Sequence, residues 1–342
     1  MSKKSSALAA AGILAAAVVL SGFSIYKDSH QKNSTDGTIT LRMAQTSSQA
    51  GAIGQSMEAF ADRIYDETEG KYKIETYHNG QLGAEIDTIE GCQMGTIDIA
   101  VVNQSTIGNF INDFQALDIP YLITSTEQAD AVFLGDIGTR FLDKLSGVQL
   151  YGLGIWESGF RNLTNSKRDV NSVDDVAGLK IRTMENSHHM DFWKKLKASP
   201  TPMSFSEVYI GLQQGTIDAC DNVNNVCIAD GYQQYAKYIS VMEYATHFNG
   251  ITMNEKKFES LTPELQDVIT KAAKKAALDC TKKLETKNAE QLEEMVAGGA
   301  EKTDNVDKAA FKEAAQSVYD KFLSNNEQGA KYYEAITALT AK

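Results

Sequence analysis

The chain has 342 residues, of which 42% are hydrophobic and 23% are charged, and it contains only four prolines. This length suits two lobes of about 100–150 residues better than one core, and the composition is that of a globular protein. The formal net charge of −12 argues against a nucleic-acid partner, because neutralising phosphates requires a basic face and none is visible.

The amino terminus has the pattern of an export signal. Two lysines precede an apolar run over residues 7–20 that ends in small residues, as in a secretory signal peptide. A buried helix of the mature protein is the alternative, and the position at the extreme terminus argues against it. When it is extended to Tyr26, the run is long enough, at about 20 residues, to remain as a membrane anchor. We expect an exported protein, periplasmic or tethered to the outer face of the cytoplasmic membrane, with a signal peptide or anchor over residues 1–24 and a polar linker over residues 25–37.

Strands and helices alternate along the rest of the chain. Apolar periodicity predicts strands over residues 38–44, 73–77 and 97–102, with helices over residues 50–68 and 85–94 between them. The same order returns in the second half, with strands over residues 149–155, 179–182 and 217–219 and helices over residues 172–177, 190–196, 205–213 and 311–322. This alternation predicts an α/β fold with parallel sheets. A helix over residues 262–297 is long enough to span two lobes.

The cysteines and histidines give no sign of a metal site. Cys92, Cys220, Cys227 and Cys280 form no CxxC motif and no cluster with histidine at metal-ligand spacing. Cys220 and Cys227 could pair, but four unpaired small apolar residues is the simpler interpretation. His188 and His189 are adjacent and cannot face one partner from a helix, so we interpret them as residues of the surface or behind the site. We expect no metal and no cofactor.

Two arginines stand at strand ends, where ligands bind in open α/β sheets. Arg161 follows residues 156–160 and Arg182 closes residues 178–181. Arginine holds a planar carboxylate through two parallel hydrogen bonds, so the pair suits an organic anion. Structural salt bridges with nearby acidic residues are the alternative.

Asn222 ends a further short strand and is either a ligand contact or a turn residue. No nucleophile elbow, catalytic triad order or phosphate-binding glycine loop is present, so nothing supports an enzyme.

Several short segments together resemble the solute-binding subunits of tripartite ATP-independent periplasmic (TRAP) transporters, which include dicarboxylate, sialate and sugar-acid binders. These segments are residues 78–83 (HNGQLG), 95–98 (GTID), 159–165 (GFRNLTN), 178–182 (GLKIR), 199–203 (SPTPM), 205–209 (FSEVY) and 214–218 (QGTID). Each is weak alone, but together they follow the family's order over about residues 38–300.

The resemblance implies a periplasmic-binding-protein-like fold of two α/β lobes, joined by crossing strands and a long helix, that closes on the ligand. Lobe I would comprise residues 38–157 and about 246–285, and lobe II residues 158–245 and about 300–342. Arg182 matches the family's carboxylate-binding arginine, Arg161 its second cationic contact, and Asn222 the asparagine that fixes the carboxylate. Gln45 and Asn103 fall where lobe I meets the rest of the ligand.

The resemblance also bears on the ligand and partners. Asn103 stands where sialate binders have a glutamate, and residues 219–223 (ACDNV) lack the proline that often follows the family's asparagine. Residues 182–186 (RTMEN) resemble sugar-acid binders, with Asn186 placed to reach a hydroxyl. We therefore expect a monomer that delivers a uronate or other sugar acid to the membrane permease subunits. A C4-dicarboxylate binder, a sensory protein that presents its ligand to a receptor, and an enzyme acting on a sugar acid are the alternatives.

Overall fold

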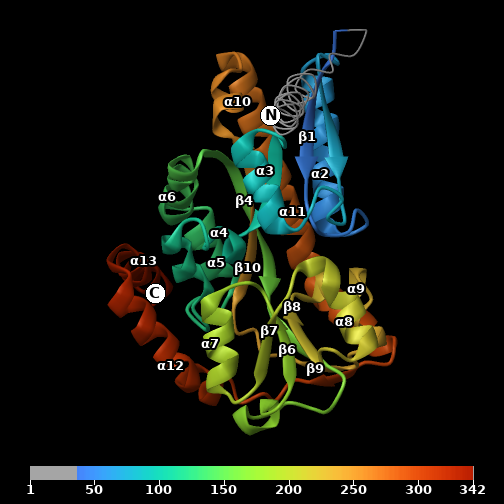
Figure 1. Cartoon of the computed structure of the whole chain (residues 1–342), viewed down its shortest axis with the longest axis vertical. Coiled ribbons are helices and arrows are strands. Elements are labelled where there is room, and N and C mark those ends of the chain that lie inside the picture. The colour runs from blue at the N-terminus through green and yellow to red at the C-terminus, as the bar shows by residue number, and fades with distance from the viewer. Residues whose placement is uncertain (1–36, 342) are drawn as a thin grey trace, which may run out of the picture.

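A computed structural model describes residues 37–341; the expected signal segment and most of the linker lie outside these residues. Two sheets form two α/β lobes, one at each end of the molecule in Figure 1. Among the helices of the described residues, none combines the length and apolar character needed to cross a membrane.

The first sheet has the strand order β2-β1-β3-β10-β4. Its strands are β1 (Ile39–Ala44), β2 (Tyr72–Tyr77), β3 (Ile99–Asn103), β4 (Leu150–Phe160) and β10 (Thr246–Asn254). The helical segments of this half are α2 (Ala52–Glu67), α3 (Glu85–Met94), α4 (Gln104–Ile107), η1 (Asn112–Asp118), α5 (Thr126–Phe133), α6 (Asp136–Lys144), η2 (Leu145–Val148) and α10 (Glu255–Glu259). The expected strands and helices between residues 38 and 102 are confirmed within a few residues.

The second sheet has the order β11-β9-β5-β8-β6-β7. Its strands are β5 (Asn162–Asn165), β6 (Lys180–Thr183), β7 (Ser199–Pro202), β8 (Ala219–Asn222), β9 (Tyr238–Ser240) and β11 (Glu301–Thr303). The shorter helical segments are η3 (Val173–Val176), α7 (Ser187–Lys195), η4 (Phe205–Glu207), α8 (Val208–Gln214), α9 (Asn224–Ala229) and η5 (Tyr232–Gln234), followed near the end of the chain by α12 (Lys308–Asn325) and α13 (Glu327–Thr340).

Both sheets are mixed, so the expectation of parallel sheets was wrong in part. β1 pairs in parallel with β2 and β3, but β10 runs antiparallel to both β3 and β4. In the second sheet β5 is antiparallel to β8 and β9. The antiparallel strands β5 and β10 each follow a crossing between the lobes. At these two points the chain enters a sheet from the other lobe, and not through a helix of the same lobe.

Two crossing segments and one long helix join the lobes. β4 ends at Phe160 in the first sheet and β5 begins at Asn162 in the second, so Arg161 lies at the crossing. The Arg161 backbone N–H donates to the Ala245 carbonyl (2.9 Å), which ties this crossing to the return segment before β10. The 35 residues of α11 (Pro263–Ala297) extend about 52 Å at 1.5 Å per residue. This helix contacts α2 and β4 in one lobe and α9 in the other, as expected for a lobe-spanning helix.

The carboxyl-terminal helices correct the expected lobe boundaries. We assigned residues 300–342 to the second lobe, and α12 does pack against α7 there. However, α13 packs against η1, α5 and α6, and the last two of these cover β4 of the first sheet. Figure 1 shows α12 and α13 running along one side of the molecule from one lobe to the other. The first sheet also extends to Phe160, beyond the expected boundary at residue 157.

Candidate functional site

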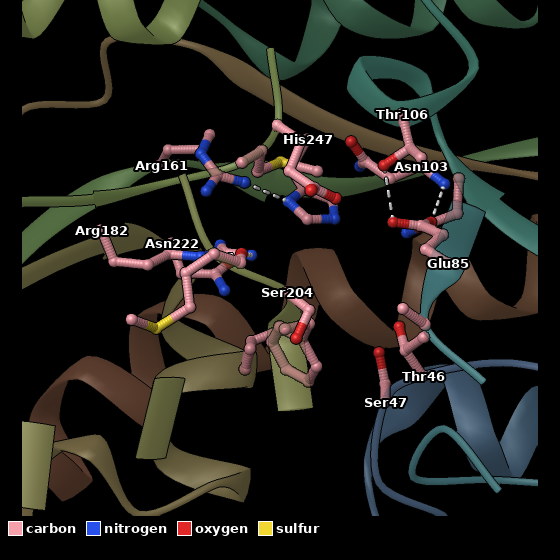
Figure 2. Close-up of a pocket in the computed structure, with 17 residues that line it drawn as sticks. Thr46, Ser47, Glu85, Asn103, Thr106, Arg161, Arg182, Ser204, Asn222 and His247 are labelled. Carbon is pink, nitrogen blue, oxygen red and sulfur yellow. Dashed lines mark hydrogen bonds between the residues drawn. The ribbon is translucent and has the colours of Figure 1, made fainter. Parts of the chain in front are cut away.

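A pocket lies between the two lobes and has about 590 Å³ of empty space, counting the part that opens to solvent. Four of the six expected ligand residues line it, namely Arg161, Arg182, Asn103 and Asn222. The rest of the lining is Thr46, Ser47, Ala84, Glu85, Thr106, Met184, Glu185, Met203, Ser204, Phe205, Val226, His247 and Asn249. Figure 2 shows the arginines, His247 and Asn222 facing Glu85, Asn103 and Thr106 across the pocket.

Arg182 is a buried cation that has no acidic side chain within ion-pair distance among the described residues. It lies on β6 with 4% of its surface exposed, and its Nε and Nη2 both donate to the Met203 carbonyl, at 3.0 and 2.8 Å. This carbonyl fixes one edge of the guanidinium plane. Within residues 37–341, Arg182 forms no ion pair. Its remaining N–H groups are therefore available to a carboxylate in the pocket.

Arg161 is equally buried but already paired. Its Nε donates to Asp221 Oδ2 (2.7 Å) and its Nη2 to the Asp221 carbonyl (2.5 Å). Burial alone would lower the pKa of Arg161, but the charge and hydrogen bond of Asp221, together with Tyr244 and Cys220, outweigh it and the pKa rises. Burial would likewise raise the pKa of Asp221, and Arg161 holds it below its usual value. The alternative of a structural salt bridge thus applies to Arg161, although its partner is none of the acidic residues near it in sequence.

His247 is a pocket residue that sequence reasoning missed. Its Nδ1 lies 2.8 Å from Arg161 Nη1. Arginine can only donate, so Nδ1 accepts and the ring proton is on Nε2. Burial and then the Arg161 charge hold the pKa of His247 well below its usual range. His247 is therefore a neutral side chain with one N–H to offer.

The two pocket asparagines have different hydrogen-bonding capacity. The Asn222 oxygen accepts from the Val223 N–H (2.9 Å), which leaves its NH₂ as a donor beside the pocket. Asn103 is fully engaged: its Nδ2 donates to Gln104 Oε1 (2.7 Å) and the Phe248 carbonyl (2.8 Å). Its Oδ1 also accepts from the N–H of Ser105 at the start of α4. Asn103 therefore shapes the pocket wall and has no donor left for a ligand.

Gln45 and Asn186 do not line the pocket, although we expected ligand contacts from both. Gln45 Nε2 instead meets His78 Nδ1 (2.8 Å), and the residues after it, Thr46 and Ser47, reach the pocket. Asn186 caps α7 by accepting from the N–H groups of His188 and His189. Its Nδ2 donates to Asp118 Oδ2 (2.7 Å) across the lobe boundary. Helix capping and this bond occupy the Asn186 amide, so nothing in this arrangement supports its expected contact with a ligand hydroxyl.

His188 and His189 are buried, so a surface position, the first of the two interpretations, was wrong; His189 lies behind the site, near the Asp221 carboxylate that pairs with Arg161. Only 5% and 1% of their surfaces are exposed, because α7 begins at Ser187 and includes both. They do face different partners, as adjacent helical residues must: His188 contacts the Phe322 ring, and His189 Nδ1 lies 3.3 Å from the Tyr244 hydroxyl. Neither lines the pocket.

Glu85 is the acidic residue of the pocket and was also missed. It begins α3, where its Oε1 accepts from the Asn103 N–H (2.5 Å) and its Oε2 from the Thr106 hydroxyl (2.7 Å). Burial raises the pKa of Glu85, although these two hydrogen bonds oppose the rise. In the sequence, Glu85 stands two residues after the segment 78–83, at the start of a predicted helix, and nothing there marks it as a pocket residue.

The remaining features of the described residues do not suit an alternative site. A wide groove on the outside of α2 and β2 is lined by Glu58, Asp62, Glu75 and a single cation, Lys73, which is unfavourable for an anion. No group of histidine, cysteine and carboxylate side chains in residues 37–341 could hold a metal ion. All four cysteines are buried and unpaired, so Cys220 and Cys227 form no disulfide.

Two α/β lobes, crossing strands, and a buried cationic pocket between the lobes define a two-lobed solute-binding protein of a transporter. The model of the family "bacterial extracellular solute-binding protein, family 7" matches residues 43–326. The chain belongs to this family, the solute-binding subunits of TRAP transporters, whose members are binding proteins and not enzymes.

Relatives and solved structures agree with this assignment. The chain is 30% identical to the 2,3-diketo-L-gulonate-binding periplasmic protein of Escherichia coli, over 87% of this chain and 91% of that protein. A TRAP periplasmic solute-binding protein of Polaromonas sp. JS666 bound to D-erythronate is 32% identical with a TM-score of 0.85, over 89% and 99% of the two chains. Another from Sulfitobacter sp. NAS-14.1, with bound β-D-galacturonate, is 26% identical with a TM-score of 0.85, over 87% and 99%.

Proposed function

We propose that this protein captures a hydroxylated organic acid, a uronate or other sugar acid, by pairing the ligand's carboxylate with Arg182 and Arg161. It then delivers the acid to the membrane permease subunits of a TRAP transporter. The observation that carries the proposal is Arg182, a buried cation with a fixed guanidinium edge and no ion pair in residues 37–341. A buried charge without a partner is unfavourable, and a ligand carboxylate would supply the partner.

The neutral groups around the arginines suit hydroxyl groups. The Asn222 NH₂ and the His247 Nε2–H are donors, while Thr46 and Ser47 carry hydroxyls that both donate and accept. The named ligands of the relatives (diketogulonate, erythronate and galacturonate) are all oxygen-rich acids of this chemical type. Together these features favour a sugar acid over a simple C4-dicarboxylate, which remains the alternative.

Contacts between the lobes suggest how binding is coupled to closure. Asn109 Nδ2 donates to the Glu185 carbonyl (2.9 Å) and Asn186 donates to Asp118, so hydrogen bonds connect the two sides of the pocket. A ligand that touches both sides favours the state in which these contacts form. Export to the periplasm, where the relatives act, would place this two-lobed binding protein beside its membrane permease.

Calorimetry across an acid panel tests the function. D-galacturonate, D-glucuronate, D-erythronate and D-galactonate are compared with succinate and malate, and each is checked for turnover. We expect at least one hydroxylated acid to bind at least about tenfold more tightly than succinate, with no consumption of ligand. Tight binding of succinate with no response to any hydroxylated acid would overturn the sugar-acid assignment.

A further inference from the structure

The wall of the pocket opposite the arginines carries a fixed carboxylate. Both oxygens of Glu85 accept hydrogen bonds, from the Asn103 N–H and the Thr106 hydroxyl. Asn103 and Thr106 are themselves buried, with 3% and 7% of their surfaces exposed. The Glu85 carboxylate is therefore held in one orientation at the pocket and cannot turn away from a bound ligand.

This carboxylate gives the pocket two electrostatic ends. Arg182 and Arg161 lie on one side and Glu85 on the other, as Figure 2 shows. Glu85 forms no ion pair within residues 37–341, although the charge of Arg182 across the pocket acts on it and opposes the rise of its pKa. Glu185 is a second acidic lining residue. Each Glu85 oxygen accepts only one of the hydrogen bonds described above and keeps capacity for another donor.

We propose that Glu85 determines the class of acid that the site binds. It favours monocarboxylates whose far end, the end away from the arginines, carries hydroxyl donors. It excludes the same carbon chain when that end is a second carboxylate. This inference rests on the proposed function, because it assumes that the arginines hold the first carboxylate. Hydroxyls at the far end donate to Glu85. A second carboxylate there offers no donor and meets a like charge in a confined space, which is a strong basis for rejection.

Two matched ligand pairs isolate this effect. D-erythronate and meso-tartrate, and D-galactonate and galactarate, differ only in whether the far carbon is a primary alcohol or a carboxylate. Calorimetry at neutral pH should show the monoacid of at least one pair binding about 100-fold more tightly than its diacid. Glu85→Gln removes the charge but keeps the size and one acceptor, and should reduce this ratio to less than about fivefold.

Two further variants separate charge from folding and geometry. Glu90→Gln makes the same change at an exposed position of α3 and should leave the ratio unchanged. Thr106→Val removes one hydrogen bond to Glu85 but keeps its charge, so it should weaken monoacid binding yet preserve rejection of the diacid.

Equal binding of both members of a pair by the wild type, or an unchanged ratio in folded Glu85→Gln, would overturn the role of Glu85 and leave the sugar-acid function intact. If neither member of any pair binds, and no acid of the wider panel binds, the proposed function itself fails and this inference fails with it.

Discussion

The two arginines of the pocket are about equally buried but differ in what surrounds their charges. Arg161 lies at the crossing between the lobes, where Asp221 and His247 accept its hydrogen bonds. Arg182 lies on β6 within one lobe, and its described partner is a neutral carbonyl. The charge of Arg161 is therefore largely balanced within the fold, and it can add only a second contact to a ligand. The charge of Arg182 has no acidic partner within ion-pair distance in residues 37–341 and is the main one that a ligand carboxylate would balance. The same residue type thus serves two purposes that sequence alone does not separate.

Asp221→Asn tests the structural half of this comparison and should have the largest effect. It leaves the Arg161 guanidinium buried without a counter-charge, which typically costs about 3–5 kcal/mol of folding free energy. Urea unfolding measures the loss. Asp267→Asn breaks the exposed pair of Asp267 with Lys271 and should change stability by less than about 1 kcal/mol. Similar small losses in both variants would contradict a structural role for the Arg161–Asp221 pair.

Glu157, which lies near the crossing at Arg161, should make the stability of the protein depend on pH. Burial raises the pKa of Glu157 to about 7 from an ordinary value of 4.5, although the N–H of Gly159 opposes the rise. The folded protein therefore holds a proton that the unfolded chain releases, so stability is lost as pH rises from about 4.5 to 7. Glu157→Gln should remove a pH-dependent loss of roughly 2–3 kcal/mol across this window. Parallel urea-derived stability curves for wild type and variant between these pH values would refute the shifted pKa.

Glycines precede both arginines and allow a matched backbone test of smaller effect. Gly159 has φ +104°, and an added Cβ would lie 2.2 Å from Asn288 Nδ2, whereas Gly178 has φ +77° with nothing within 4 Å. Gly178→Ala should lower the free energy of unfolding by only about 1 kcal/mol, the strain of placing alanine in a left-handed backbone conformation. Gly159→Ala would also push the Asn288 side chain on α11 out of its position and should lose about 0.5–1.5 kcal/mol more. Equal melting temperatures for the two variants would show that the crossing tolerates a side chain at residue 159 as well as the turn before β6 does at residue 178.

Much of the fold could be predicted from the sequence, because apolar periodicity reports local structure directly. The strands and helices between residues 38 and 102 and the long helix α11 follow this pattern. The antiparallel placement of β10 could not be predicted, since it depends on where the chain recrosses between lobes. The packing of α13 on the first lobe was missed for the same reason: the apolar face of a helix does not say which surface covers it.

The site was predicted in outline but not in its internal partners. Arg161, Arg182 and Asn222 could be found because they stand at strand ends, where ligands bind. Asn186 stands next to such a position, but its amide serves to cap α7 and bind Asp118. Glu85 and His247 reach the pocket from distant parts of the chain, and neither carries a local signal of that placement. Hydrogen-bond partners far apart in sequence decide which polar residues remain free for a ligand.

The most direct test of whether Arg182 binds the ligand carboxylate is a thermodynamic cycle in which both the protein and the ligand are changed. Wild type and Arg182→Ala are titrated by calorimetry with the tightest-binding acid of the panel and with its neutral primary amide. We expect Arg182→Ala to weaken binding of the acid by about 2–5 kcal/mol, or two to three decades or more. It should bind acid and amide about equally, because the group that distinguishes them is gone. An Arg182→Ala protein that still prefers the acid over the amide as strongly as wild type does would contradict the assignment of Arg182 as the carboxylate partner.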